Sequence, residues 1–143
     1  MKSKRPLVID SSVAVKWLNK QDEDYIDKSD KILKDVQEGK TYLIMPELGK
    51  YEIENALLYK NMPVQNTIGS LAAYYSIPVQ FVPQDQQQAQ LAMEIAFENK
   101  VTFYDASFMS LAIEYKAKLI TDNPKHQGKK INGLKVISLK DYK

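Results

Sequence analysis

The chain has 143 residues, of which 44% are hydrophobic and 27% are charged, and these fractions are those of an ordinary globular domain. Its formal net charge of +2 is too small to identify a protein that binds nucleic acids or membrane surfaces. Because the chain has no cysteine and a single histidine, His126, we exclude disulfides, cysteine nucleophiles, thiolate metal sites and multi-histidine zinc sites. Carboxylates are the main groups left for chemistry.

The sequence has no segment typical of membrane insertion or export. No apolar run approaches the length of a membrane span, so we expect no association with a membrane. The first apolar run, residues 7–9, is too short for the core of a signal peptide. We therefore expect a cytoplasmic protein.

Short apolar runs that alternate with helical segments predict five β-strands. In chain order, the expected strands are residues 7–9, 42–45, 79–82, 118–121 and 135–139. The expected helices are residues 11–18, 22–38, 46–59, 64–75, a helix whose first turns are the glutamine-rich residues 84–90, and 104–115. This alternation is typical of a parallel sheet that helices cover on both faces. The sequence therefore predicts an α/β fold, a three-layer α/β/α sandwich with a central parallel sheet of about five strands, in one domain over residues 1–143.

Two carboxylates are notable for their positions in these elements. Asp10 follows the first strand at its carboxyl end, where open α/β sheets bind ligands, although it could equally cap the next helix. Glu52 lies within a helical stripe that we expect to face the core, formed by Leu48, Tyr51, Asn55 and Tyr59. A carboxylate that faces a core needs a partner or a metal, whereas one at the edge of the stripe would reach water.

Two further polar groups occupy similar positions. Asp105 belongs to the expected inward face of the helix 104–115, although an aspartate in a first turn also complements the helix dipole. Thr121, Asp122 and Asn123 directly follow Leu119 and Ile120 at the end of the fourth strand, where they could also form a turn. Three carboxylates with few competing nitrogen or sulfur ligands form an oxygen-only site that suits Mg²⁺ or Mn²⁺. Such a site can activate water against a phosphodiester.

Four segments together resemble a known family. They are VIDSSV at residues 8–13, Pro46 with EIENAL at 52–57, YDA at 104–106 with LA at 111–112, and LIT at 119–121. In order and spacing they resemble PIN-domain ribonucleases, and most closely the VapC-type toxins of toxin–antitoxin modules. The resemblance covers about residues 6–141. It implies a Mg²⁺- or Mn²⁺-dependent endoribonuclease with an α/β/α fold, a homodimer, a small antitoxin partner, and an RNA substrate that is a tRNA, an rRNA or an mRNA.

The resemblance also implies residue roles. Asp10, Glu52 and Asp105 would hold the metal. The family often supplies a fourth acid from a Thr-x-Asp segment, which here reads Thr121-Asp122-Asn123, so that Asn123 occupies the acidic position.

Adjacent residues of an extended segment point to opposite sides, so only one of Asp122 and Asn123 can face the metal. We expect Asn123 to face it and Asp122 to be secondary. Ser12 and Thr121 fall where the family has hydroxyls near the metal, and Asn55 lies next to Glu52 as a supporting residue.

Two other functions are possible. The departure at Asn123 favours a catalytically weakened PIN domain that only binds RNA or a protein. A phospho-acceptor receiver domain is also a small α/β domain with an acidic pocket. It would need an acidic pair near the end of the first strand, but Asp10 is followed by two serines and no other acid precedes Asp22. A phosphatase that uses Asp-x-Asp is disfavoured for the same reason.

Charge is unevenly distributed along the chain. Residues 116–143 carry eight lysines and two aspartates, a local net charge of +6, whereas residues 22–38 carry seven acids and three lysines, a net charge of −4. The basic segment could contact RNA phosphates and steer RNA to the protein, or it could be a solvated tail and loop.

Overall fold

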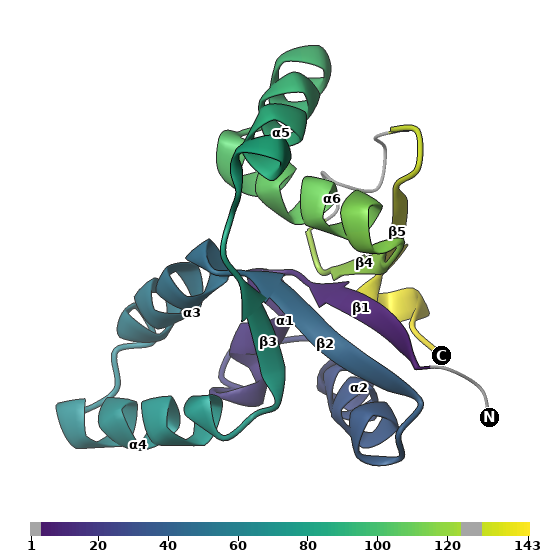
Figure 1. Cartoon of the computed structure of the whole chain (residues 1–143). Helices are drawn as coiled ribbons and strands as arrows, with labels where there is room; N and C mark the ends of the chain where they lie inside the picture. Colours follow the sequence, from purple (N-terminus) through teal and green to yellow (C-terminus); the bar gives the residue numbers. More distant parts are fainter. Residues whose placement is uncertain (1–3, 124–129) are drawn as a thin grey trace.

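The computed structural model describes residues 4–123 and 130–143 (Figure 1). Its centre is a five-stranded sheet in the order β3-β2-β1-β4-β5, and every neighbouring pair is parallel. The strands are β1 (Arg5–Ile9), β2 (Thr41–Pro46), β3 (Val79–Val82), β4 (Lys118–Thr121) and β5 (Lys135–Ser138). The predicted parallel sheet is therefore confirmed, and the five strands lie where the apolar runs indicated.

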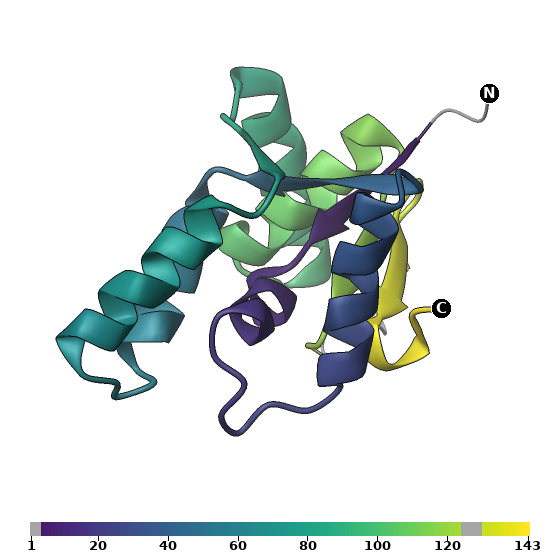
Figure 2. The same cartoon turned by 90° about the horizontal axis from the view of Figure 1, so that it is seen from below.

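Helices cover both faces of the sheet (Figures 1 and 2). They are α1 (Ser11–Ala14), α2 (Ile26–Gln37), α3 (Leu48–Leu58), α4 (Val64–Tyr75), α5 (Gln86–Asn99) and α6 (Phe103–Tyr115), with short 3₁₀ turns η1 (Val15–Trp17) and η3 (Leu139–Asp141). One face carries α6, with α5 packed on it, and the opposite face carries α1 and α2. The predicted three-layer α/β/α sandwich is confirmed.

The central strand and α6 form the most buried part of the molecule. Val8 and Ile9 of β1 have no exposed surface, and every residue of α6 from Ala106 to Ala112 is buried. A helix that is apolar on nearly all sides needs neighbours on nearly all sides. It finds them in β1, β2 and β4 below and in α5 above. Because β1 lies at the middle of the sheet, the residue that follows it lies at the middle of the carboxyl edge.

The expected inward stripe of α3 is wrong. Tyr51 and Tyr59 are 67% and 72% exposed, and Asn55 is also exposed. The buried stripe is instead the one formed by Gly49, Ile53 and Leu57. These residues repeat every four positions and include the two aliphatic side chains that gain most from burial, whereas tyrosine can keep its hydroxyl in water at the surface.

The second helix begins later than the sequence indicated, at Ile26 rather than at residue 22. Asp22 and Tyr25 have φ angles of 59° and 58°, which a right-handed helix does not contain. Residues 20–25 therefore form a loop. Among the described helices, none is long and apolar enough to cross a membrane.

Candidate active site

The centre of the site is the Asp10 carboxylate, which directly follows β1. Its backbone N–H donates to the carbonyl of Ile120 in β4 (2.9 Å), so the sheet pairing continues to this residue. Its Oδ2 atom accepts hydrogen bonds from Ser12 Oγ (2.7 Å) and Thr121 Oγ1 (2.8 Å). Although Asp10 occupies the N-cap position of α1, its side chain makes no capping hydrogen bond. The carboxylate is therefore held by two hydroxyls rather than used to cap the helix.

The loop after β4 orients both hydroxyls. The backbone N–H of Asp122 donates to Ser12 Oγ (3.1 Å), and that of Asn123 donates to Thr121 Oγ1 (2.9 Å). A hydroxyl has one proton to donate, and each of these accepts from the backbone and directs its proton at Asp10. The site thus has a carboxylate fixed at the carboxyl edge by residues from two neighbouring strand ends.

Glu52 and Asp105 lie on two other helices, α3 and α6. Ser11 Oγ donates to Glu52 Oε1 (3.0 Å), which joins the start of α1 to α3. Asp105 lies in the first turn of α6, where its backbone N–H donates to the capping hydroxyl of Thr102 (3.0 Å). Both acidic residues are half-buried. The position of Asp105 is one in which a carboxylate complements the helix dipole.

The structure brings some of the expected residues together and not others. Asp10, Ser12 and Thr121 form one hydrogen-bonded group, and Glu52 is bonded to the adjacent Ser11. Within residues 4–123 and 130–143, no three acidic or histidine side chains are grouped closely enough to hold a metal ion. The donor set of carboxylates and hydroxyls nevertheless has the oxygen chemistry that Mg²⁺ and Mn²⁺ require. The assignment of Asp10, Glu52 and Asp105 as ligands stays a prediction.

No pattern in the sequence indicates that Lys16 is buried. It lies in η1 with 1% of its side chain exposed, and its Nζ atom pairs with Asp122 Oδ2 (2.9 Å) and Glu23 Oε1 (3.0 Å). Burial lowers the pKa of Lys16, but the hydrogen bonds to Asp122 and Glu23 outweigh it, so the pKa is raised overall. The other Glu23 oxygen pairs with Lys60 (2.6 Å).

Lys16 determines where the Asp122 carboxylate lies. The Asp122 carboxylate pairs with the ammonium group of Lys16, while the Asp122 backbone N–H donates to Ser12. Asp122 therefore has a structural partner of its own, and the role of Asn123 toward a metal stays a prediction. His126 and the expected turn at Pro124 lie outside the described residues.

Comparisons with known proteins agree with the fold described above. The PIN domain family model matches residues 7–130. Among solved structures, VapBC2 from Rickettsia felis bound to a promoter DNA fragment has a TM-score of 0.72 and 17% identity, with 93% of this chain and 98% of that chain covered.

Two further structures are similar in fold. DNA-bound VapBC from Salmonella typhimurium has a TM-score of 0.67 and 14% identity, with 94% and 98% covered. VapC20 of Mycobacterium tuberculosis, a sarcin–ricin loop cleaving toxin, has a TM-score of 0.63 and 13% identity, with 87% and 96% covered. The search of curated proteins gave no significant match.

The hydrogen bonds to Asp10 lead to a prediction about stability. In Asp10→Asn the amide oxygen can accept from both hydroxyls and the charge is lost, so the melting temperature without metal should stay equal or rise. Asp10→Ala removes the acceptor from the buried hydroxyl of Thr121 and the half-buried hydroxyl of Ser12, and should destabilise the protein by about 1–3 kcal/mol. Urea and thermal unfolding of both variants measure this. A large loss of stability in Asp10→Asn would show that the carboxylate charge itself holds the fold.

Proposed function

Because this chain belongs to the PIN-domain family, we propose that it is a divalent-metal-dependent endoribonuclease and the toxin of a toxin–antitoxin pair. The observation that carries the proposal is the Asp10 carboxylate, fixed at the carboxyl edge of the sheet by Ser12 and Thr121 in a chain that matches the family model over residues 7–130. Ligands bind at this edge in parallel α/β sheets.

The proposed metal ligands are Asp10, Glu52 and Asp105, with Asn123 as a weaker oxygen donor and Asp122 as secondary. A bound Mg²⁺ or Mn²⁺ would supply an activated water and neutralise charge on the phosphate. The protein's own contribution is orientation: Ser12 and Thr121 hold the Asp10 carboxylate, and Ser11 holds Glu52. These two carboxylates are therefore already oriented before a cation and an RNA phosphodiester bind.

RNA is the proposed substrate, and a small antitoxin is the proposed partner. The similar structures are of VapBC proteins and of a toxin that cleaves the sarcin–ricin loop, which supports both parts of the proposal. We propose that the antitoxin places an Arg or Lys against the site carboxylates, because a charge-assisted hydrogen bond to a carboxylate is strong and would exclude the metal.

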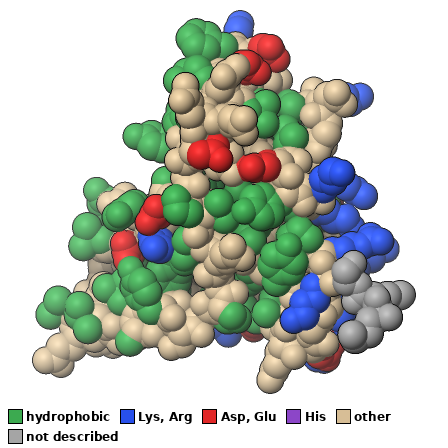
Figure 3. Space-filling model, in the orientation of Figure 1, with side chains coloured by type: hydrophobic (Ala, Val, Ile, Leu, Met, Phe, Trp, Pro, Cys, Tyr) green, Lys and Arg blue, Asp and Glu red, His purple; other side chains and the backbone are tan. Residues whose placement is uncertain are grey.

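The homodimer is supported by apolar side chains that α3 and α4 leave at the surface. Figure 3 shows them gathered over these two helices, and they include Leu58, Val64, Ile68 and Tyr75, each 59–73% exposed. A patch of this kind on a soluble domain is typical of a protein–protein contact. We propose that two copies of the chain associate through it.

The second candidate is a PIN domain that binds RNA or a protein without cleaving. It is favoured by the amide of Asn123 at the family's acidic position and by the separation of the carboxylates in the described residues. A measurement of Mn²⁺ binding separates the two functions, because a domain that only binds RNA or a protein requires no metal ion.

The proposed activity predicts metal-dependent cleavage. The purified protein should cleave RNA with Mg²⁺ or Mn²⁺, leave 5′-phosphate and 3′-hydroxyl ends, and lose all activity in EDTA. Asp10→Asn should be inactive, whereas Asp24→Asn, the same change at an exposed loop aspartate, should be unaffected. Cleavage that persists in EDTA, or products with a 2′,3′-cyclic phosphate, would rule out this mechanism.

Asp122 and Asn123 should respond differently to substitution. Asn123→Asp adds a charged oxygen at the site and should tighten Mn²⁺ binding, measured by calorimetry. Asp122→Ala should change Mn²⁺ binding little but destabilise the fold by about 1–3 kcal/mol, because it removes one of the two partners of a buried ammonium group. If Asp122→Ala abolishes cleavage and Asn123→Ala is silent, the acidic site is displaced by one residue.

Toxicity can be tested in cells. Expression of the wild-type chain alone should slow growth of the host, and co-expression of the neighbouring gene should restore it. The Asp10→Asn variant serves as the control and should leave growth unaffected at an equal soluble level. Normal growth with soluble wild-type protein would contradict the toxin role and would leave the nuclease activity to be judged by the cleavage assay.

A further inference from the structure

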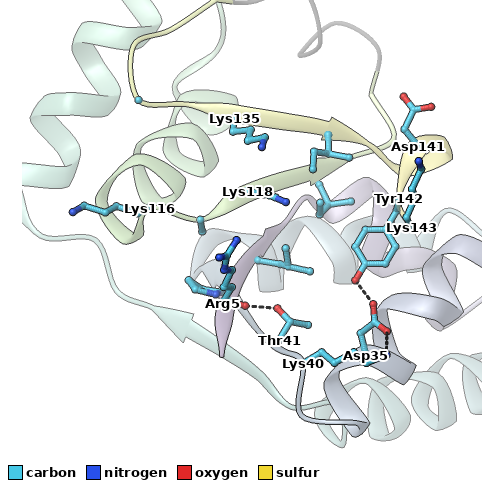
Figure 4. Close-up of a pocket in the computed structure, with 16 residues that line it drawn as sticks. Arg5, Asp35, Lys40, Thr41, Lys116, Lys118, Lys135, Asp141, Tyr142 and Lys143 are labelled. Atoms are coloured by element: carbon cyan, nitrogen blue, oxygen red, sulfur yellow. Dashed lines mark hydrogen bonds and ion pairs between the residues drawn. The ribbon is translucent and has the colours of Figure 1, made fainter. Parts of the chain in front are cut away.

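A cavity lies at the edge of the sheet where the strands begin, opposite the edge that carries Asp10. It has a volume of about 690 Å³ and is bounded by the first residues of β1, β2, β4 and β5, by α2, and by the last residues of the chain (Figure 4). This volume is within the range of small-molecule sites, which is roughly 300–1,000 Å³. Arg5 and Asp10 are the two ends of one extended segment, so their Cα atoms are roughly 16 Å apart.

The cavity is strongly cationic. Of the described residues that line it, six are Lys or Arg and two are Asp. Arg5, Lys118 and Lys135 come from three adjacent strands, β1, β4 and β5. Lys118 pairs in register with Leu7 on one side and with Lys135 on the other, and Arg5 is two residues before Leu7. The alternation of side chains along a strand therefore places the three cations on one face of the sheet.

This arrangement is unfavourable for the empty protein. Lys118 and Lys135 are register partners on strands about 4.8 Å apart, and like charges at such positions repel. In the described part of the chain, none of the ion pairs involves Arg5, Lys118 or Lys135. A row of lysines can protect an edge strand from pairing, but that reason applies to Lys135 only, since β1 and β4 are inner strands.

One of the two acidic residues that line the cavity is already engaged. Asp35 of α2 accepts hydrogen bonds from Lys31 and from the Tyr142 hydroxyl, as Figure 4 shows for Tyr142. Burial raises the pKa of Asp35, but these two hydrogen bonds outweigh it and the pKa is lowered. Asp35 is thus a structural carboxylate that joins α2 to the end of the chain, and among the described ion pairs neither Asp35 nor Asp141 pairs with Arg5, Lys118 or Lys135.

Part of the wall is apolar. Leu7, Ile120 and Ile137 lie along the same strands, and the Tyr142 ring closes one side. A ligand that fits both the cations and the apolar wall has an anionic group and a flat, partly apolar body. We propose that this cavity binds a phosphate-bearing ligand of nucleotide size, with its phosphate against Arg5, Lys118 and Lys135. Arg5 supplies the forked donors that match phosphate, and the two lysines supply charge.

The ligand can be a free nucleotide or one nucleotide of an RNA strand, and only the RNA source rests on the proposed function. Calorimetry on the wild-type chain in EDTA, where no cleavage occurs, separates the two. The probes are adenosine 5′-monophosphate, inorganic phosphate, adenosine, and a short uridine oligomer. Saturable binding of the monophosphate but not of adenosine identifies a free nucleotide. Saturable binding of the oligomer alone identifies RNA.

Matched variants place the binding in the cavity. Lys118→Gln and Lys135→Gln should each weaken binding about tenfold, the loss expected for one charge-assisted contact. Without ligand they should have an equal or higher melting temperature, because they relieve the repulsion. Lys34→Gln, at an exposed lysine of α2 outside the cavity, should change neither property.

Two results would overturn the proposal. One is the absence of saturable binding by the monophosphate, phosphate or the oligomer at millimolar concentration. The other is binding that Lys34→Gln weakens as much as Lys118→Gln does, which would mean a diffuse charge effect. Neither result bears on RNA cleavage, and a protein that does not cleave RNA can still bind the monophosphate.

Discussion

The hydrogen bond from Thr121 to Asp10 is the contact on which the site depends, because it joins the ends of the two central strands through their side chains. The parallel sheet brings β1 and β4 to the same edge, and the backbone bond from Asp10 to Ile120 keeps them in register to their last residues. A side chain one residue beyond a buried strand has little freedom. The hydroxyl of Thr121, fully buried, therefore fixes the carboxylate at low entropic cost, and Ser12 repeats the contact from the other side.

The carboxylates around this contact differ in the groups that hold them. Asp10 and Glu52 are held by the neutral hydroxyls of Ser12, Thr121 and Ser11, which orient a carboxylate without neutralising it. Asp122 is held instead by the buried ammonium group of Lys16. A carboxylate paired with a buried cation is a poor ligand for another cation, because binding would leave the first one without its partner. Asp10 and Asp122 thus differ in what holds them: Asp10 accepts from two hydroxyls, whereas Asp122 forms an ion pair that stabilises the loop.

The sequence predicts strands well here and helix faces less well. The inner strands β1, β2 and β4 are mostly buried, and short apolar-rich runs mark all five strands close to the observed residues. The face of α3 was misjudged because its tyrosines suit both core and surface, and periodicity alone does not choose between two adjacent stripes. Asp10 and Thr121 follow predictable strand ends and were expected together. Lys16 has no local signal, since its burial depends on Asp122, 106 residues away, and on Glu23 in a loop.

Acidic side chains such as Asp10 lie at the carboxyl edge of the sheet, and basic side chains lie near the opposite edge. The fold explains part of this difference. Because α6 leads directly into β4, its end lies at the edge where the strands begin, and there the helix dipole favours Lys116. The start of α6 points toward the carboxyl edge, where the dipole favours Asp105. The dipole acts only within the terminal turn, so it does not account for Lys118 and Lys135 within the strands. Lys118 and Lys135 are register partners on adjacent strands, so their charges repel one another. A fold that tolerates this repulsion gains stability when an anion binds there, as in the phosphate site proposed for the cavity.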